Sequence, residues 1–461
     1  MRLFRFDLPK PAAWPPPRDP ATVAEALAYA RRRDPIGDWA HTILALMYLA
    51  ALPLAPALTT VTGVGLAGYA ILRLPHTWRT YTVLLRDPIL WILAAFVGWY
   101  ALSLAWSSDP AQGRDELRAA RALATPLVLW PVIHRAPWLI TALLVGVIAQ
   151  NGAQLANFLG WIENAKYNTP DRLGGLLHPV QTGAWCAAAL CWFTAAVLNG
   201  RGRWRWLALL GAAATAAGLV ATGSRGPWLA AAVALPALVI TVALRRPESR
   251  RAALALAALA IVGSVAAWPL ARGRIVTRLQ TAVAEVKAAQ QDDVYWSSAG
   301  LRTAMWSWAW SAFEEHPVRG IGAGGYRNYV ATHPTFLAAV ELAPVKQKPK
   351  RAKYMLRDHP HSTYLHLLGC TGLVGGSLFA AAGILALGRC GRSASDHPYF
   401  DGTLFVLLTW LIGAALDCYH LNGQLVGLLG LVVALTLKHR LPVGYTVPEP
   451  HPPPGQTPET G

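Results

Sequence analysis

The feature that most constrains this chain is a series of apolar stretches, each about 17 to 25 residues long, that recurs along almost its whole length. A helix of that length can cross a hydrocarbon core of roughly 30 Å. Since 54% of the 461 residues are hydrophobic and only 14% are charged, an ordinary water-soluble domain is excluded. We predict an all-α polytopic membrane protein with twelve spans, at residues 39–57, 59–74, 89–106, 117–134, 138–159, 180–199, 206–221, 227–244, 252–270, 362–387, 400–418 and 421–437.

The positions of Lys and Arg predict how these spans are oriented. Positive residues stay cytoplasmic in short loops. With twelve spans and both ends inside, the cytoplasmic connections include the basic stretches 201–205, 245–251, 389–392 and 438–440, whereas the short outer loops hold fewer basic residues. The net charge of +17 therefore comes mainly from Lys and Arg residues that set the orientation of the spans, and we predict no nucleic-acid partner.

The spans divide the chain into five parts. Residues 1–38 form a cytoplasmic tail rich in Pro and Arg, in which no apolar core of a cleavable signal peptide is apparent, so we expect the first span to be a retained anchor. Residues 39–270 hold spans one to nine, 271–361 a large outer loop, 362–440 spans ten to twelve, and 441–461 a Pro-rich cytoplasmic tail. The five cysteines fall in or at the ends of predicted spans without metal-type spacing, which predicts packing roles.

The outer loop 271–361 is the one large segment outside the predicted spans. It holds 13 of the 41 Lys and Arg residues, an excess that long loops tolerate and that could hold an anionic partner. Its basic run 346–353 is either a solvated or headgroup-facing patch or part of a ligand site. Apolar residues at helical spacing predict one helix over 275–286 and a second over about 299–315.

Two arginines at the outer membrane edge are candidates for binding an anion. Arg225 precedes Gly226 and Pro227, which mark a helix start, so its guanidinium would sit beside backbone N–H groups that attract phosphate. Arg302 heads an aromatic stripe on the predicted helix 299–315. The alternative for both is an arginine that snorkels to lipid headgroups.

A histidine is the third candidate, in the stretch DHPHSTYLHLLGCTGLVGG at 358–376. We expect Asp358 to cap and Pro360 to start the tenth span, which places His361 in its first turn. A helix N-terminus helps keep an imidazole neutral, as a general base requires. His359 and His366 compete for this role, but His359 precedes the proline and His366 points to another side of the helix. The alternative is an interfacial histidine without chemistry.

These residue types favour one kind of reaction. The sequence has no DxD triad, GxxxxGK loop, HExxH or GxSxG motif, which disfavours metal-held sugar nucleotides and several hydrolases. Two arginines and a histidine, with no metal and no cofactor, suit displacement at a carbon that bears a phosphate leaving group. The arginines neutralise the departing pyrophosphate, and one base activates the attacking sugar hydroxyl.

The motifs resemble those of the O-antigen ligase and polymerase superfamily of bacterial envelope glycosyltransferases. The resemblance rests on TGSRG at 222–226, an Arg ahead of EEHPVRGIGAGGYRNY at 314–329, the HPHSTYLHLLGCTGLVGG stretch, and WSSDPAQGRDELR at 106–118. It implies an enzyme of the bacterial inner membrane that takes a glycan from undecaprenyl pyrophosphate at the periplasmic face. A ligase of this kind joins the glycan to the lipid A core of lipopolysaccharide, without metal and with inversion.

The resemblance also implies roles for residues. Arg225 and Arg302 would bind the pyrophosphate, and His361 would activate the acceptor hydroxyl. Asp417 corresponds to an acidic residue of the family, and Arg172 lies where many members carry an outer-loop arginine. Supporting contacts to the pyrophosphate from Arg319 or Arg327 are left open. Two departures from the family pattern are Ser362, where Asn is common, and the long basic run 346–353.

Three alternatives to a ligase remain open at this point. The same superfamily includes O-antigen or exopolysaccharide polymerases and protein O-oligosaccharyltransferases. A transporter or lipid flippase without covalent chemistry is a different class, and it predicts charged groups near the bilayer midplane rather than at one edge. The basic outer loop favours a phosphorylated acceptor such as lipid A core.

Overall fold

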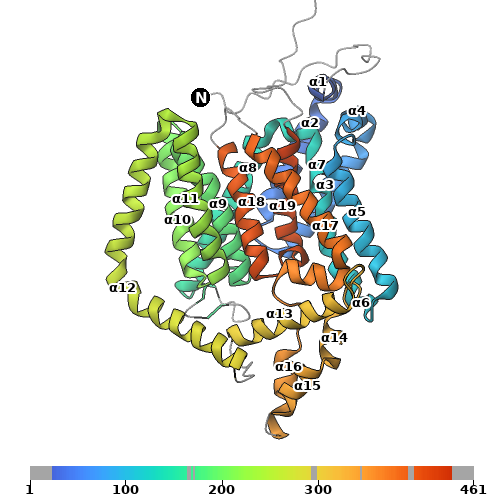
Figure 1. The fold of residues 1–461 in the computed structure, drawn as a ribbon. Coiled ribbons are helices and arrows are strands. Elements are labelled where there is room, and N and C mark those ends of the chain that lie inside the picture. The colour runs from blue at the N-terminus through green and yellow to red at the C-terminus, as the bar shows by residue number, and fades with distance from the viewer. Residues whose placement is uncertain are drawn as a thin grey trace, which may run out of the picture.

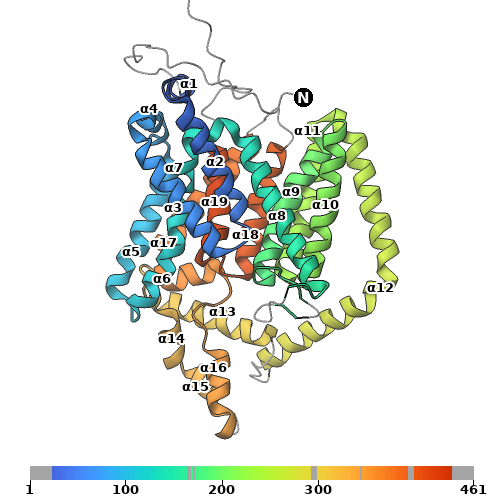
Figure 2. The same cartoon turned by 180° about the vertical axis from the view of Figure 1, so that it is seen from behind.

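The computed structural model describes residues 23–162, 168–169, 172–291, 298–342, 345–392 and 399–438. The Pro-rich segments 1–22 and 441–461 and most of the basic stretch 438–440 lie outside these residues. The described residues form helices joined by turns, with an isolated bridge between Thr169 and Arg172. Most helices stand side by side in one bundle, and α13 to α16 lie together beyond one end of it (Figures 1 and 2). That end is called the α13 end below.

The α-helices are α1 (Val23–Arg33), α2 (Pro35–Ala51), α3 (Pro56–Leu72), α4 (Leu74–Leu84), α5 (Pro88–Leu102), α6 (Pro110–Ala120), α7 (Thr125–Leu129), α8 (Ala136–Phe158), α9 (Pro179–Asn199), α10 (Arg203–Ala221), α11 (Arg225–Arg245), α12 (Arg250–Gln291), α13 (Ser298–Glu315), α14 (Tyr326–Thr332), α15 (Pro334–Glu341), α16 (Lys348–Met355), α17 (Thr363–Arg392), α18 (Phe400–Leu416) and α19 (Gly423–Leu437). Short 3₁₀ helices include η1 (Ser103–Trp106), η2 (Arg121–Ala124), η3 (Trp130–Arg135) and η6 (Tyr419–Leu421).

The helices fit a multi-pass membrane protein. Among the described residues, six helical stretches are long and apolar enough to cross a membrane, or seven if the bent pair α3 and α4 counts as one span. Two shorter apolar helices, α18 and α19, complete the C-terminal part of the bundle. The all-α class is confirmed, and the number of twelve spans stays a prediction.

Two of the predicted spans are not straight helices. The predicted span 117–134 is divided among α6, η2, α7 and η3, because Pro126 and Pro131 each sit at the start of a new helical segment and proline cannot continue a helix interior. The predicted span 59–74 ends in a bend of 87° between α3 and α4. At this bend the buried Arg73 binds Asp34 at 2.9 Å and Asp38 at 3.4 Å.

The outer loop 271–361 does not begin with the separate helix that the sequence predicted. The predicted ninth span and the predicted helix over 275–286 form one helix, α12, which continues through Pro269. It runs beside α10 and α11 and then passes beneath the bundle toward α13 (Figure 1). The second predicted helix is confirmed, since α13 spans Ser298–Glu315.

The core of the bundle surrounds α9. This helix is buried along nearly its whole length between α10, α11 and α18, with Trp185 and Trp192 fully enclosed. All five cysteines are free and buried, which confirms the packing roles predicted for them. A second apolar cluster, which includes Trp308, Tyr326 and Phe336, joins α13 to α14 and α15 and gives the α13 end a core of its own.

Candidate active site

The segment that carries His361 joins α16 to α17 and has an unusual backbone. Among the described residues, His361 is the one non-glycine residue with positive φ, at 51°. The helix α17 begins only at Thr363, so the prediction that His361 lies in its first turn is wrong. Asp358 does not cap the helix either, because it lies well before Thr363; it forms an ion pair with Arg327 at 2.8 Å. The Thr363 N–H instead donates to the Asp417 carbonyl at 3.2 Å.

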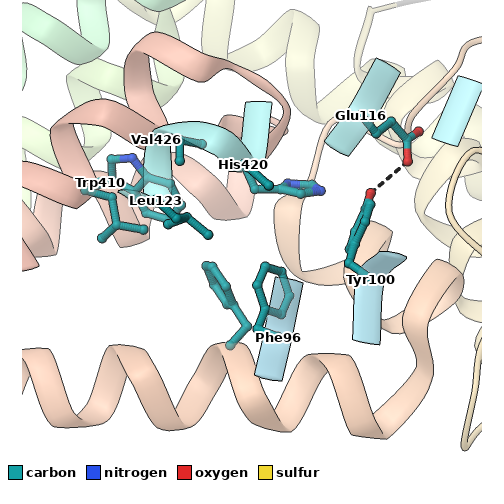
Figure 3. Close-up of a pocket in the computed structure, with 10 residues that line it drawn as sticks. Phe96, Tyr100, Glu116, Leu123, Trp410, His420 and Val426 are labelled. Carbon is teal, nitrogen blue, oxygen red and sulfur yellow. Dashed lines mark hydrogen bonds between the residues drawn. The ribbon is translucent and has the colours of Figure 1, made fainter. Parts of the chain in front are cut away.

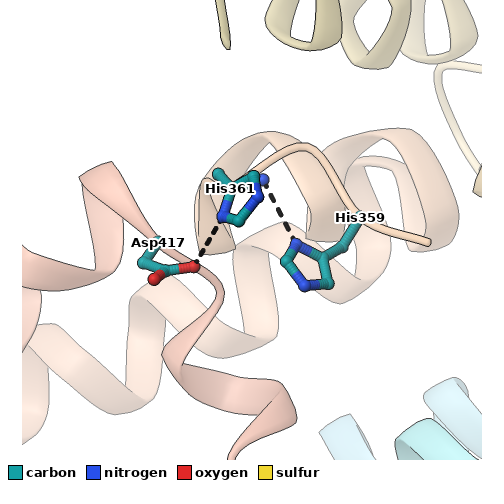
Figure 4. Close-up of side chains that lie close together, drawn as sticks. All are labelled: His359, His361 and Asp417. Carbon is teal, nitrogen blue, oxygen red and sulfur yellow. Dashed lines mark hydrogen bonds and ion pairs between the residues drawn. The ribbon is translucent and has the colours of Figure 1, made fainter. Parts of the chain in front are cut away.

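His361 and Asp417 face each other across this helix start (Figure 4). The Nδ1 atom of His361 lies 3.1 Å from Oδ1 of Asp417, and the two side chains are 30% and 22% exposed. A carboxylate at this position accepts a hydrogen bond from Nδ1–H, which favours the tautomer with its proton on Nδ1 and leaves the lone pair on Nε2. The pair therefore has the geometry of an oriented general base with access to solvent.

The charges around this pair are fixed at neutral pH. Burial alone would raise the pKa of Asp417, but the hydrogen bond from His361, the charges of His361 and His359, and the Cys418 backbone N–H lower it to about 2. Burial and the neighbouring His361 lower the pKa of His359 to about 4. Near pH 7 Asp417 is therefore a carboxylate and His359 is neutral.

His359 supports the backbone of His361. Its Nδ1 accepts the His361 backbone N–H at 3.4 Å (Figure 4), and the two rings are 4.6 Å apart between centroids. One ligand atom from each of His359, His361 and Asp417 lies within 4.8 Å of the others, so these three residues could also hold a metal ion. Within this cluster His361 is hydrogen-bonded to both of the other residues.

Arg172 and Arg225 flank the start of α11. A guanidinium N–H of Arg172 donates to Oγ of Ser224 at 3.3 Å, and Ser224 is the residue before the helix. Arg225 is the first residue of α11 and is exposed, which confirms the predicted helix start. A helix N-terminus between two guanidinium groups can bind a phosphate or pyrophosphate.

The start of α11 lies next to the His361–Asp417 pair. A methyl group added to Gly226 would lie 3.4 Å from Cβ of Leu416, and Leu416 is the residue before Asp417. His178, at the start of α9, is close enough to both groups for their charges to act on its imidazole. Its pKa is lowered by burial, then by the charge of Arg172 and by His361, and is raised by Asp417. The arginine-flanked start of α11 and the His361–Asp417 pair therefore lie close together at the α13 end.

The other predicted arginines occupy separate positions around this site. Arg302 is half-buried on α13, which packs against α17, but within the described chain it makes no hydrogen bond or ion pair with His361 or Asp417. Arg319 lies over the Trp106 ring at 5.9 Å and lines an open pocket with Ser108 and Asn328. Through its ion pair with Asp358, Arg327 holds the segment that leads to His361.

Sequence reasoning did not select His178 or Glu116. His178 precedes a proline at a helix start, and the same His-Pro signal at 359–360 could have suggested it. Glu116 lies in the quoted motif 106–118 beside Asp109 and Asp115, and only the fold distinguishes it by burying it against His366. His366, which lies in α17, has its Nε2 3.5 Å from the Glu116 carboxylate.

Apolar helices of spanning length in one bundle indicate a multi-pass membrane protein, and the candidate site lies near one end of that bundle. Residues 210–380 match the family model for O-antigen ligase, and no curated protein matches the chain. The chain thus carries an O-antigen ligase domain over these residues, which are 171 of its 461. The matched region contains Arg225, Arg302 and His361.

Proposed function

We propose that this protein is an O-antigen ligase that transfers a glycan from undecaprenyl pyrophosphate to the lipid A core of lipopolysaccharide. The observation that carries the proposal is the 3.1 Å contact between His361 Nδ1 and Asp417 Oδ1 beside the arginine-flanked start of α11. The proposal includes twelve spans, both termini in the cytoplasm of a bacterium, and the loop 271–361 and the site on the periplasmic side of the inner membrane.

The reaction in this proposal is a single displacement. Arg225 and Arg172 bind the pyrophosphate at the α11 start while the polyprenyl tail stays in the bilayer, and Arg302 approaches from α13. The acceptor hydroxyl attacks the anomeric carbon as His361 Nε2 takes its proton. The bond between that carbon and the pyrophosphate oxygen breaks, and undecaprenyl pyrophosphate leaves with both bonding electrons. Asp417 stabilises the imidazolium that forms.

A polymerase would use the same donor and the same base, so the acceptor distinguishes the two functions. The excess of basic residues between 271 and 361, including the run 346–353 on η5 (Val345–Gln347) and α16, supports an acceptor that carries phosphates. A neutral growing glycan would gain nothing from that charge.

The test is transfer by purified protein from undecaprenyl-pyrophosphate glycan in the presence of EDTA, with lipid A core and free glycan acceptor offered together. Glycan on lipid A core supports the ligase. Elongated lipid-linked glycan makes the protein a polymerase. If neither acceptor gives a product, the result favours a transporter without covalent chemistry. Because the proposed reaction uses no metal, EDTA should leave the rate unchanged; loss of activity that one divalent cation restores would contradict a metal-free site at His359, His361 and Asp417.

Arg225→Ala should reduce transfer by about 10²- to 10³-fold, because it removes a group that stabilises charge on the leaving pyrophosphate. Arg225→Lys should recover only part of the rate, since lysine keeps the charge but loses the bidentate contact. The matched control is Arg201→Ala, an exposed arginine just before α10 at the opposite end of the bundle. Equal rates for the wild type and a correctly folded Arg225→Ala variant would remove Arg225 from the site.

A further inference from the structure

A buried carboxylate on α6 joins three other parts of the molecule. Oε2 of Glu116 accepts the Tyr100 hydroxyl of α5 at 2.7 Å and the Gly324 backbone N–H at 2.9 Å. The same oxygen lies 3.5 Å from Nε2 of His366 on α17. Glu116, Tyr100, Gly324 and His366 are called the Glu116 clamp below.

The surroundings of Glu116 make its charge costly to bury. Glu116 is 5% exposed and lines a small cavity whose other walls are mainly apolar, among them Phe96, Leu123 and Trp410 (Figure 3). Its second oxygen, Oε1, has no hydrogen-bond partner among the described residues. An apolar residue of similar volume is often at least as stabilising at such a site. We therefore look for a role of the Glu116 carboxylate other than stabilising the fold.

The glycine-rich loop 316–325 is built to reach this carboxylate. Gly324 has φ of +79°, and a Cβ atom there would lie 2.3 Å from the Gly113 backbone nitrogen of α6. Only glycine therefore allows the loop to approach α6 closely enough for the Gly324 N–H to bind Glu116. The same loop donates backbone hydrogen bonds to α17, from Ile321 to Gly369 and from Gly322 to Cys370, each at 2.9 Å.

Two routes lead from the clamp to His361. The first runs from Gly324 into α14, where Arg327 pairs with Asp358 at 2.8 Å, just before His361 in the chain. The second runs through His366, which lies in α17 just after His361. The clamp is therefore connected to the chain on both sides of the proposed base.

The backbone of His361 needs such support. A non-glycine residue at φ of 51° is in a sparsely populated conformation, and that conformation persists only where the surrounding structure holds it. The His359 ring accepts the His361 N–H from one side, but His359 belongs to the same segment. The attachments of this segment to the rest of the fold include the Asp358–Arg327 pair, the Asp417 contacts and α17 itself.

We propose that Glu116 is a positioning residue for the transfer reaction. It does not touch substrate; it holds the glycine-rich loop against α17 and so keeps the 358–363 segment in the conformation that aims Nε2 of His361 at the acceptor hydroxyl. This inference rests on the proposed function for its kinetic effect and on geometry alone for its effect on the backbone.

The first test is kinetic and uses full-length protein in detergent or proteoliposomes. Glu116→Ala should lower kcat by about 100-fold, as expected for an ångström-scale misplacement of a catalytic group, while KM for the lipid-linked donor stays within about twofold because Arg225 and Arg172 are unaffected. Glu116→Gln should recover part of kcat, since its amide oxygen can still accept the Tyr100 and Gly324 hydrogens. The matched control is Asp115→Asn, an exposed neighbour paired with Arg118, which should behave as wild type.

The second test needs no activity. Hydrogen exchange of the amides in 358–363 should be faster in Glu116→Ala, or in Glu116→Gln if the alanine variant does not fold, while the amides of α9 and α11 keep their wild-type rates. If the wild-type protein has no transferase activity, the proposed function is wrong, but the exchange difference between the wild type and the Glu116 variants still tests the positioning role. Wild-type kcat in both Glu116 variants, unchanged exchange at 358–363, or faster exchange throughout the bundle would overturn the positioning role.

Discussion

Replacing His361 by alanine should slow glycan transfer by about 10²- to 10⁴-fold, which is the range for loss of a positioned general base. The half-exposed imidazole contributes little packing, and the backbone on both sides is held by other contacts, so the variant should insert and fold normally. The measurement is the initial rate of transfer by purified protein at saturating donor and acceptor. KM for the donor should change little, because the pyrophosphate binds at the start of α11.

The matched control for this variant is His76→Ala, which removes an imidazole from α4 at the opposite end of the bundle. It should keep the wild-type rate. Turnover near the wild-type rate by a monodisperse His361→Ala protein would remove the general-base assignment, and the neutral His359 would then be the next residue to replace.

Asp417→Asn should slow transfer to a similar extent, about 10²- to 10⁴-fold, because it changes which imidazole nitrogen of His361 carries the proton. The carboxylate of Asp417 accepts from Nδ1 and leaves Nε2 without a proton. An asparagine amide can instead donate to Nδ1, which favours the tautomer with its proton on Nε2, where the base is needed. The Cys418 N–H donates to the same Oδ1 atom at 2.8 Å, so an amide nitrogen in that place also loses this hydrogen bond, and the thermal stability of the variant is measured beside its rate.

The control for this substitution lies on the same helix. Asp401 is in the first turn of α18 and pairs with Arg246 at 2.7 Å, whereas Asp417 directly follows the last residue of that helix. Asp401→Asn should leave transfer unchanged even if it lowers thermal stability. Equal losses in the two variants would mean that the effect comes from weakening α18 and would contradict a specific role for Asp417.

The sequence was sufficient to predict the all-helical class and most helix positions in the bundle. Apolar stretches of spanning length define α9, α10, α11, α18 and α19 to within a few residues. The prediction was least accurate where proline and ion pairs shape the chain, as at Pro126, Pro131 and Arg73, because a hydropathy window averages over such single residues. It also separated α12 into two helices, since its apolar and amphipathic parts have different patterns but share one continuous backbone.

The sequence allowed several residues of the candidate site to be predicted one by one, but it did not predict which of them contact each other. Residue type and helix-start signals selected His361 and Arg225, and resemblance to a family added Asp417 and Arg172. The contact between His361 and Asp417 joins positions 56 residues apart, and no local pattern predicts such a contact. The left-handed backbone of His361 and the choice of Glu116 over Asp115 depend likewise on tertiary packing.

The central claim is that the acceptor hydroxyl, activated by His361, displaces the pyrophosphate in one step. The most direct measurement of this claim is the anomeric configuration of the first product, determined by NMR from a donor of known configuration. Direct displacement predicts inversion at the anomeric carbon. Retention would require a covalent glycosyl intermediate on a protein nucleophile, and it would contradict the role proposed for His361.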